Sequence, residues 1–397
     1  MRTSDDRILT THVGSLPRST ELTTLLLKRD AGVTVDENEL KALVQACTTD
    51  AVRKQIAAGI DIVNDGEQAR AGFSTQIAAR MSGFGARSAS RRRQATDYTR
   101  FPGFAEYWKW MFRGIEAHSH NQPQAVGELH YLDLVPVRSE CDQLNGALMA
   151  VGTENIEAFF TSPSPGIIST TMENAYYESH ERYVFALAQE LRKEYEAIID
   201  AGLILQIDAP DLALERNILF QDASDAEFLS VMELHIAALN EALRGIPVDR
   251  VRLHVCWGAW GRPHADDIAL ETILPMLLSA RVGALSIPFA SPRHQHEYQV
   301  LRSIRLPDHL VLIPGVIDNT TNIVEHPEVV ARRIEEAVSV VGDRSRVIAG
   351  TDCGFGTFAG FEQVAKDVVY AKLASCRQGA DVASQRLWGK SAGRLPS

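Results

Sequence analysis

Short apolar segments recur along the chain, and each is followed by a polar break and then by a stretch with helical spacing. The segments are rich in Val, Ile and Leu and lack regular polar alternation, which is typical of strands buried on both faces. The expected strands are Ile8–Val13, Ile60–Asn64, Ala125–Leu129, Ala158–Thr161, Leu203–Ile207, Val251–Val255, Ala284–Phe289, Val311–Val316 and Val347–Ala349. Residues 178–201 and 328–341 carry apolar side chains at helical spacing and are expected to form helices.

A strand followed by a helix, repeated about eight times, indicates parallel β/α units rather than a sandwich or a helix bundle. Eight such units that close on themselves form a TIM (β/α)8 barrel, and we expect residues 1–397 to form one such domain. One of the nine segments must then lie outside the barrel, and Ala125–Leu129 is expected to be that segment because it follows an irregular insertion. A doubly wound open sheet is the alternative, but no Gly-rich phosphate-binding turn follows any segment.

The insertion spans Met81 to Gln124 and carries a basic run, Arg91–Arg93, followed by aromatic residues up to Phe112. Basic residues followed by aromatic ones can bind single-stranded nucleic acid. The net charge of −11 disfavours this interpretation, because nucleic-acid binding depends on neutralising phosphates. We expect either an aromatic-rich helix that packs on the barrel or a lid that covers the substrate.

The composition, with 45% hydrophobic and 23% charged residues, is that of an average soluble protein. No apolar segment approaches the length of about 20 residues that spans a bilayer. The polar N-terminal residues show no apolar segment typical of a secretory signal, so we expect a cytoplasmic protein with neither membrane nor nucleic acid as a partner. The five cysteines are irregularly spaced and odd in number, which favours reduced thiols.

Polar residues follow several of the expected strands, and barrel active sites lie at the carboxyl ends of strands. These residues are Ser15, Glu67, Asp208, His254, Cys256 and Cys353. His254 and Cys256 face the same way because side chains alternate along a strand. Together with Cys353 they offer one nitrogen and two sulfurs, a ligand set typical of catalytic zinc. From spacing alone, two packed cysteines and a hydrogen-bonded histidine remain the alternative.

Five motifs occur in the order found in the cobalamin-independent methionine synthase family, which the chain resembles over nearly its whole length. They are Thr10–Arg18, Asp65-Gly-Glu67, Gln206-Ile-Asp208, His254-x-Cys256 and Asp352-Cys353-Gly354. Full-length synthases have two barrels, and this chain has room only for the C-terminal, catalytic one. Single-barrel members include epoxyalkane:coenzyme M transferase, which the chain resembles further at 208–213, 254–264, 290–297 and 324–327.

The resemblance implies a UROD/MetE-like barrel in which His254, Cys256 and Cys353 bind zinc, and the zinc binds a small substrate thiol. In the synthase, the positions that match Val13, Ser15, Glu67 and Asp208 hold the amino-acid end of homocysteine. The implied activity is zinc-dependent alkyl transfer, foremost methyl transfer, from an alkyl donor to the thiolate. Zinc is suited to activate the thiol for this reaction. A free thiol has a pKa of about 8.5 and is mostly protonated at neutral pH, whereas metal coordination deprotonates it.

Two positions depart from the synthase pattern. Pro288 stands where the synthase has a fourth zinc ligand, a glutamate, and the turn 318–321 lacks the histidine that protonates the leaving group. His294 and His296 are therefore candidates for acid–base catalysis, together with Asp208, or for the fourth ligand; surface histidines in a helix-starting loop are the alternative. His264 and Asp266 offer similar acid–base groups, but an ordinary structural role is favoured for both.

Three functions remain open at this point. The first is methyl transfer of the methionine synthase type. The second is ring-opening or C–S lyase chemistry of the 2-hydroxypropyl-coenzyme M lyase type. The third is an inactive zinc-barrel binding protein, which the two departures suggest. The sequence leaves the thiol, the alkyl donor and the oligomeric state undetermined.

Overall fold

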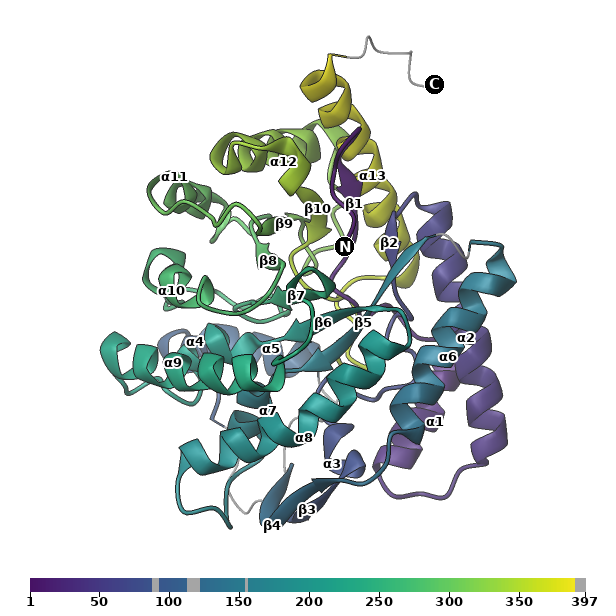
Figure 1. Ribbon diagram of the computed structural model, residues 1–397, viewed down its shortest axis with the longest axis vertical. Helices are drawn as coiled ribbons and strands as arrows, with labels where there is room; N and C mark the ends of the chain where they lie inside the picture. The colour runs from purple at the N-terminus through teal and green to yellow at the C-terminus, as the bar shows by residue number, and fades with distance from the viewer. Residues whose placement is uncertain (88–92, 113–121, 154–155, 390–397) are drawn as a thin grey trace.

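The computed structural model describes residues 1–87, 93–112, 122–153 and 156–389, and its centre is an eight-stranded parallel sheet (Figure 1). The strands follow one another in the order β1-β10-β9-β8-β7-β6-β5-β2. They are β1 (Leu9–Thr10), β2 (Ile62–Val63), β5 (Glu157–Pro163), β6 (Ile204–Asp208), β7 (Val251–His254), β8 (Ala284–Pro288), β9 (Val311–Ile317) and β10 (Ile348–Thr351).

The two edges of this sheet meet and close it into a barrel. The Asp61 N–H donates to the Thr10 carbonyl at 3.1 Å, and the Thr11 hydroxyl donates to the Ile62 carbonyl at 3.0 Å. The predicted TIM barrel is therefore confirmed, and each barrel strand overlaps one of the predicted apolar segments, with ends that differ by up to three residues.

Helices surround the ring of strands (Figure 1). The longer ones are α1 (Thr20–Asp30), α2 (Glu37–Ala57), α6 (Val135–Val151), α8 (His180–Asp200), α9 (Asp225–Ala242), α10 (Leu270–Leu277), α12 (Pro327–Val341) and α13 (Lys366–Trp388). The shorter ones are α3 (Ile77–Arg80), α7 (Pro165–Thr171) and α11 (Val300–Ser303). None of the helices among the described residues combines the length and the apolarity that crossing a membrane requires.

The two predicted helices are confirmed as α8 and α12. The Ser179 hydroxyl caps α8 by accepting a bond from the Arg182 N–H, so the helix begins at His180 rather than at the predicted Glu178. Its apolar side chains, among them Tyr183, Leu187 and Leu191, are buried against the barrel, as their helical spacing predicts.

The inserted segment lies outside the barrel sheet. Its strands β3 (Met81–Arg87) and β4 (Pro123–Tyr131) pair as an antiparallel ribbon, which confirms that Ala125–Leu129 is not a barrel strand. Strand β3 was not predicted, because Met-Ser-Gly-Phe-Gly-Ala-Arg has little of the β-branched composition of a strand.

Two short helices of the insertion, α4 (Thr96–Arg100) and α5 (Pro102–Met111), pack on loops at the carboxyl end of the barrel. In α4, Asp97 forms a buried ion pair with Arg262 in the loop after β7. Next to α5, the ring of Phe112 lies 4.8 Å from that of Phe361, which follows β10. The aromatic segment thus contacts loops of the barrel, but no α5 side chain is buried, and Tyr107 and Trp110 are exposed. Arg91 and Arg92 of the basic run lie outside the described residues.

The barrel interior changes from apolar to polar toward the carboxyl ends of the strands. One layer is apolar and includes Leu9, Phe159 and Ile313. Buried Arg252 stacks on Phe159 at 3.8 Å and donates to Gln206 at 2.6 Å and to Thr11 at 3.0 Å. Burial lowers the pKa of Arg252 to about 9. The layer formed by these polar groups supports the strand-end residues described next.

Candidate metal centre and the adjoining cavity

Three predicted metal ligands meet at the carboxyl end of the barrel. His254 is the last residue of β7, Cys256 lies two residues further on, and Cys353 lies two residues beyond β10. One ligand atom from each of the three side chains lies within 4.8 Å of the others, and the two sulfurs are 3.8 Å apart. In the sheet, β8 and β9 lie between β7 and β10, so these residues meet where the strand ends converge at the mouth of the barrel.

The donor atoms of this cluster suit a zinc ion. The Nε2 of His254 is buried without a hydrogen-bond partner among the described residues, which is costly unless the nitrogen binds something else. The hydrogen bond from the Cys353 thiol and the neighbouring His254 together lower the pKa of Cys256 well below its usual value. A thiolate, a second thiol and an imidazole match the preference of zinc for sulfur and nitrogen.

Close backbone packing fixes the position of Cys353. A Cβ atom at Gly354 would lie 2.0 Å from the Ser15 hydroxyl oxygen, so this position accepts only glycine without rearrangement. On the other side, the Asp352 carboxylate accepts backbone N–H bonds from Phe289, Ala290 and Ser291 at 2.7–3.0 Å. Asp352 thereby ties the loop after β8 to β10, a positioning role that the sequence analysis did not assign.

The predicted substrate-binding residues lie beside the cluster. Asp208 is the register partner of His254 across β6 and β7, and burial raises the pKa of Asp208 to about 7. Glu67 has a left-handed backbone (φ 55°); its Oε1 accepts from the Thr161 hydroxyl at 3.0 Å, whereas its buried Oε2 has no partner among the described residues. Ser15 lies against Gly354, and the carbonyl of Val13 accepts a bond from Gln206.

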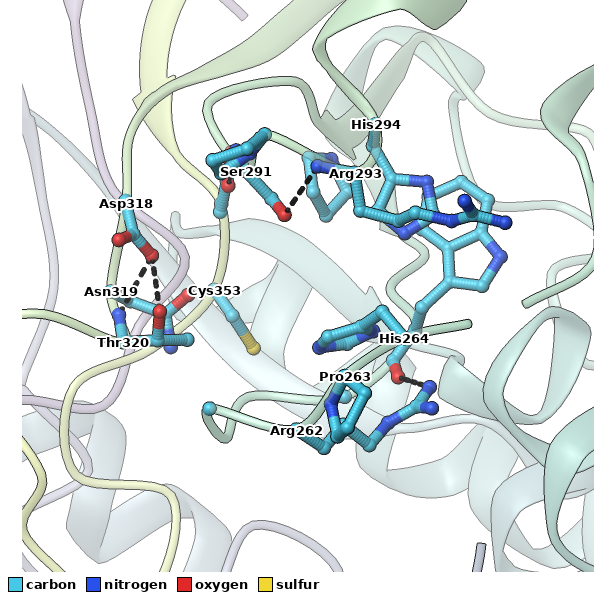
Figure 2. Close-up of a pocket in the computed structure, with 16 residues that line it drawn as sticks. Arg262, Pro263, His264, Ser291, Arg293, His294, Asp318, Asn319, Thr320 and Cys353 are labelled. Carbon is cyan, nitrogen blue, oxygen red and sulfur yellow. Dashed lines mark hydrogen bonds between the residues drawn. The ribbon is translucent and has the colours of Figure 1, made fainter. Parts of the chain in front are cut away.

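A cavity of about 250 Å³ adjoins Cys353 (Figure 2). Its walls come from the loops after β7, β8 and β9 and include Pro288, His264, His294 and Asp318. On β8 the wall is Pro288, which has no side chain that could bind a metal. In the turn after β9, Asp318 accepts bonds from the Thr320 N–H and hydroxyl, both at 2.8 Å, and no histidine is present.

The structure places only one of the two predicted acid–base histidines at this cavity. His294 is buried, stacks on Trp257 at 4.1 Å, and donates to Glu297 at 2.8 Å and to Asp267 at 3.0 Å. Burial alone would lower the pKa of His294, but the two carboxylates outweigh it and raise the pKa to about 9. His296 is exposed and is not part of the cavity wall.

A second polar cluster in this wall was not predicted. The Asp267 carboxylate is hydrogen-bonded to His264 Nδ1 at 2.7 Å. It also forms a buried ion pair with Arg262, and Arg262 forms a second buried ion pair with Asp97 of α4. One ligand atom each from His264, Asp267 and His294 lies within 4.8 Å of the others. Asp266, by contrast, lies outside this cluster and forms a solvent-exposed ion pair with Arg100. The segment Arg262-Pro-His-Ala-Asp-Asp267 contains three of the side chains that form this cluster. The cluster could not be predicted from it, because Asp97, which pairs with Arg262, is distant in the chain.

Comparison with known proteins agrees with this geometry. Residues 8–97 and 146–375 match the family model "Cobalamin-independent synthase, Catalytic domain". A methionine synthase of Sulfurisphaera tokodaii is 24% identical over 96% of this chain and 94% of its own length. One from Sulfolobus acidocaldarius is 27% identical over 66% of each chain.

Solved structures show the same fold. A B12-independent methionine synthase from Shewanella sp. W3-18-1, in complex with selenomethionine, superposes with a TM-score of 0.71 at 20% identity, over 96% of this chain and 99% of that one. A putative vitamin-B12 independent methionine synthase from Listeria monocytogenes gives 0.64 at 19% identity, over 97% and 100%. Because the family model spans most of the barrel, including all three residues of the His/Cys/Cys cluster, the chain belongs to the family of the cobalamin-independent synthase catalytic domain.

Proposed function

We propose that the protein is a zinc-dependent S-alkyltransferase that moves an alkyl group, foremost methyl, from a donor to a small thiol such as homocysteine. The observation that carries this proposal is the His254/Cys256/Cys353 cluster, with the unpartnered His254 Nε2, beside a cavity at the carboxyl end of the barrel. When bound there, zinc would lower the pKa of a substrate thiol and leave its sulfur nucleophilic.

The residues beside the cluster are proposed to bind the amino-acid end of the thiol. The free Oε2 of Glu67 and the carboxyl group of Asp208 are suited to an ammonium group, and Ser15 and the backbone at Val13 complete this side. Glu67 is held in a left-handed conformation, a strain typical of positions that the surrounding structure fixes for a purpose. Binding both substrates in one enclosed space aligns sulfur and alkyl carbon and excludes water as a competing nucleophile.

A second candidate reaction is supported by Pro288 and by the turn at Asp318, both in the cavity wall. Because that turn has no histidine to protonate a leaving group, a donor whose leaving group departs without strong acid catalysis is favoured. A strained epoxide is such a donor. Epoxide:thiol transfer, or the reverse C–S cleavage, is therefore the alternative. We expect weak or absent activity with polyglutamyl methyltetrahydrofolate.

The test is a matrix of thiols and donors on zinc-loaded enzyme. Homocysteine and 2-mercaptoethanesulfonate are each combined with mono- and polyglutamyl methyltetrahydrofolate, 1,2-epoxypropane and iodomethane, and the thioether is measured by mass spectrometry above the non-enzymatic rate. We expect a thioether that depends on zinc and is absent with Cys353→Ser. If no combination gives enzyme-dependent thioether, alkyl transfer is wrong and an inactive zinc-barrel binding protein is the better interpretation.

A further inference from the structure

The leaving atom of the alkyl donor needs a proton, and the residues proposed to bind the thiol do not supply one. When sulfur attacks carbon, the S–C bond forms and the bond from carbon to the leaving atom breaks, with its electron pair passing to the leaving atom. A leaving nitrogen or oxygen then needs a proton, and a general acid at this position typically accelerates such a step 10²–10⁴-fold. The acid must face the cavity that adjoins Cys353.

Most of the polar groups in the cavity wall are already committed. Both ring nitrogens of His294 donate to carboxylates, so its protons are held by Glu297 and Asp267. Asp352 accepts three backbone N–H bonds. Asp318 accepts bonds from its own turn. The Arg262 guanidinium donates to Asp97, to Asp267 and to the Trp257 carbonyl.

His264 differs from these groups. Its Nδ1 is bound to Asp267 at 2.7 Å, while its Nε2 makes a longer hydrogen bond, 3.3 Å, to the neutral Trp260 carbonyl rather than to a second carboxylate. Figure 2 shows that the His264 ring and the Cys353 sulfur face the same open space. The side chain is 12% exposed, so solvent reaches the ring.

The surroundings hold His264 in one orientation. Burial alone would raise the pKa of Asp267, but hydrogen bonds from His264 and His294 and the charge of Arg262 keep it well below its usual value. The carboxylate therefore stays ionised and fixes the Nδ1–H, which leaves Nε2 for exchange with a bound molecule. The backbone of His264 is left-handed (φ 56°), and a non-glycine residue keeps that conformation where its surroundings impose it.

We propose that His264, oriented by Asp267, is the general acid that protonates the leaving atom of the alkyl donor through Nε2. The inference rests on the proposed alkyl transfer and applies to donors whose leaving atom must gain a proton, such as an epoxide oxygen or an amine nitrogen. The proton that the thiol loses on ionisation balances the proton that His264 delivers, so the net reaction consumes none. Asp267 is a positioning residue in this scheme.

The test compares donors that do and do not need a proton. His264→Asn keeps an N–H donor for Asp267 and suits the left-handed backbone, because asparagine is enriched there, but it has no titratable nitrogen. With homocysteine or 2-mercaptoethanesulfonate as the thiol, we expect turnover with monoglutamyl methyltetrahydrofolate or 1,2-epoxypropane to fall at least 100-fold. Turnover with iodomethane, whose leaving iodide needs no proton, should stay within threefold. His296→Gln is the matched control, and zinc content and thermal melting report whether each variant is folded.

The possible outcomes separate this inference from the proposed function. If the parent enzyme alkylates the thiol but His264→Asn loses both kinds of donor equally, or neither, His264 is not the acid. A parent that uses only iodomethane also overturns the inference. If the parent holds two zinc ions and His264→Asn holds one, His264 is a metal ligand of the second cluster instead. If the parent shows no alkyl transfer with any donor, the proposed function fails and this inference with it.

Discussion

The metal cluster and the cavity wall adjoin each other but are held in place by different means. His254 ends strand β7, and the parallel ladder with β6 and β8 fixes it directly, while Cys256 lies two residues beyond the strand. The wall is made of loops whose shape depends on side-chain ion pairs, above all those of Arg262 with Asp97 and Asp267. The first region is a consequence of barrel geometry, whereas the second depends on a contact with the inserted helix α4.

This contrast indicates which part of the site can be altered without disturbing the metal cluster. Replacing strand-end residues would alter the candidate metal cluster and the proposed thiol site, which lie at the strand ends of the barrel. The wall instead carries Pro288, which ends β8 and still pairs with Gly315 in the ladder, and a turn after β9 that has no histidine. We therefore expect substitutions in the two regions to separate thiol activation from use of the alkyl donor.

The largest expected effect is on the metal. Cys256→Ser and Cys353→Ser should each lose most of the zinc, because each removes one of the three candidate ligands. The activity of each variant should fall by a factor of about 1,000 or more. Cys47→Ser and Cys376→Ser serve as controls, since neither thiol belongs to the cluster. Elemental analysis of the purified variants checks this, and equal zinc retention in all four would contradict the assignment.

The next effect concerns the cavity wall and depends on pH. The pKa of His294 is raised from 6.5 to about 9. The stabilisation from its protonated form is thus fully present below pH 6.5 and is lost as pH rises through 9. This rise corresponds to about 3 kcal/mol. Urea unfolding at pH 6 and pH 9.5 should show the destabilisation by His294→Gln shrinking by up to that amount; a difference that does not change with pH would be evidence against it.

A smaller effect is expected on the thiol side. Glu67→Gln and Asp208→Asn should each weaken homocysteine binding by about 2 kcal/mol, as expected for hydrogen bonds between charged groups, and should leave zinc content unchanged. Calorimetric titration of zinc-loaded protein measures this directly. If both variants bind homocysteine as tightly as the parent, the thiol is not an amino acid, and a sulfonate or uncharged thiol becomes the better candidate.

The smallest effect is expected for His296. Because this side chain is exposed and does not line the cavity, His296→Gln should change turnover less than twofold and stability by less than about 0.5 kcal/mol. Steady-state kinetics alongside His294→Gln provides the comparison. A large loss of activity with His296→Gln would place the acid–base group outside the cavity described here.

The sequence predicted those parts of the molecule that follow from barrel geometry. The carboxyl ends of parallel strands converge, so a polar residue after a buried apolar run, such as Asp208 or Cys353, can be placed at one site without knowing any side-chain contact. The i, i+2 spacing of His254 and Cys256 was sufficient to pair them. Ala125–Leu129 could be excluded from the barrel because it followed an irregular insertion.

The cavity wall could not be predicted in the same way. Asp97 and Arg262 are 165 residues apart, and no periodicity links a short helix in an insertion to a loop after β7. The spacing of His294 and His296 does not reveal that one ring stacks on Trp257 while the other is exposed. The left-handed backbone of His264 likewise has no local sequence signal such as a glycine, so its place in the wall emerges only from the structure.

The most direct test of zinc-dependent thiol alkylation is X-ray absorption at the zinc edge, recorded on the purified protein before and after addition of homocysteine or 2-mercaptoethanesulfonate. We predict about one zinc per chain with one nitrogen and two sulfur ligands from the protein, at about 2.0–2.1 and 2.3 Å. Addition of the right thiol should add a third sulfur to the shell. A zinc shell that lacks two sulfurs at the start, or that no thiol changes, would contradict the central claim.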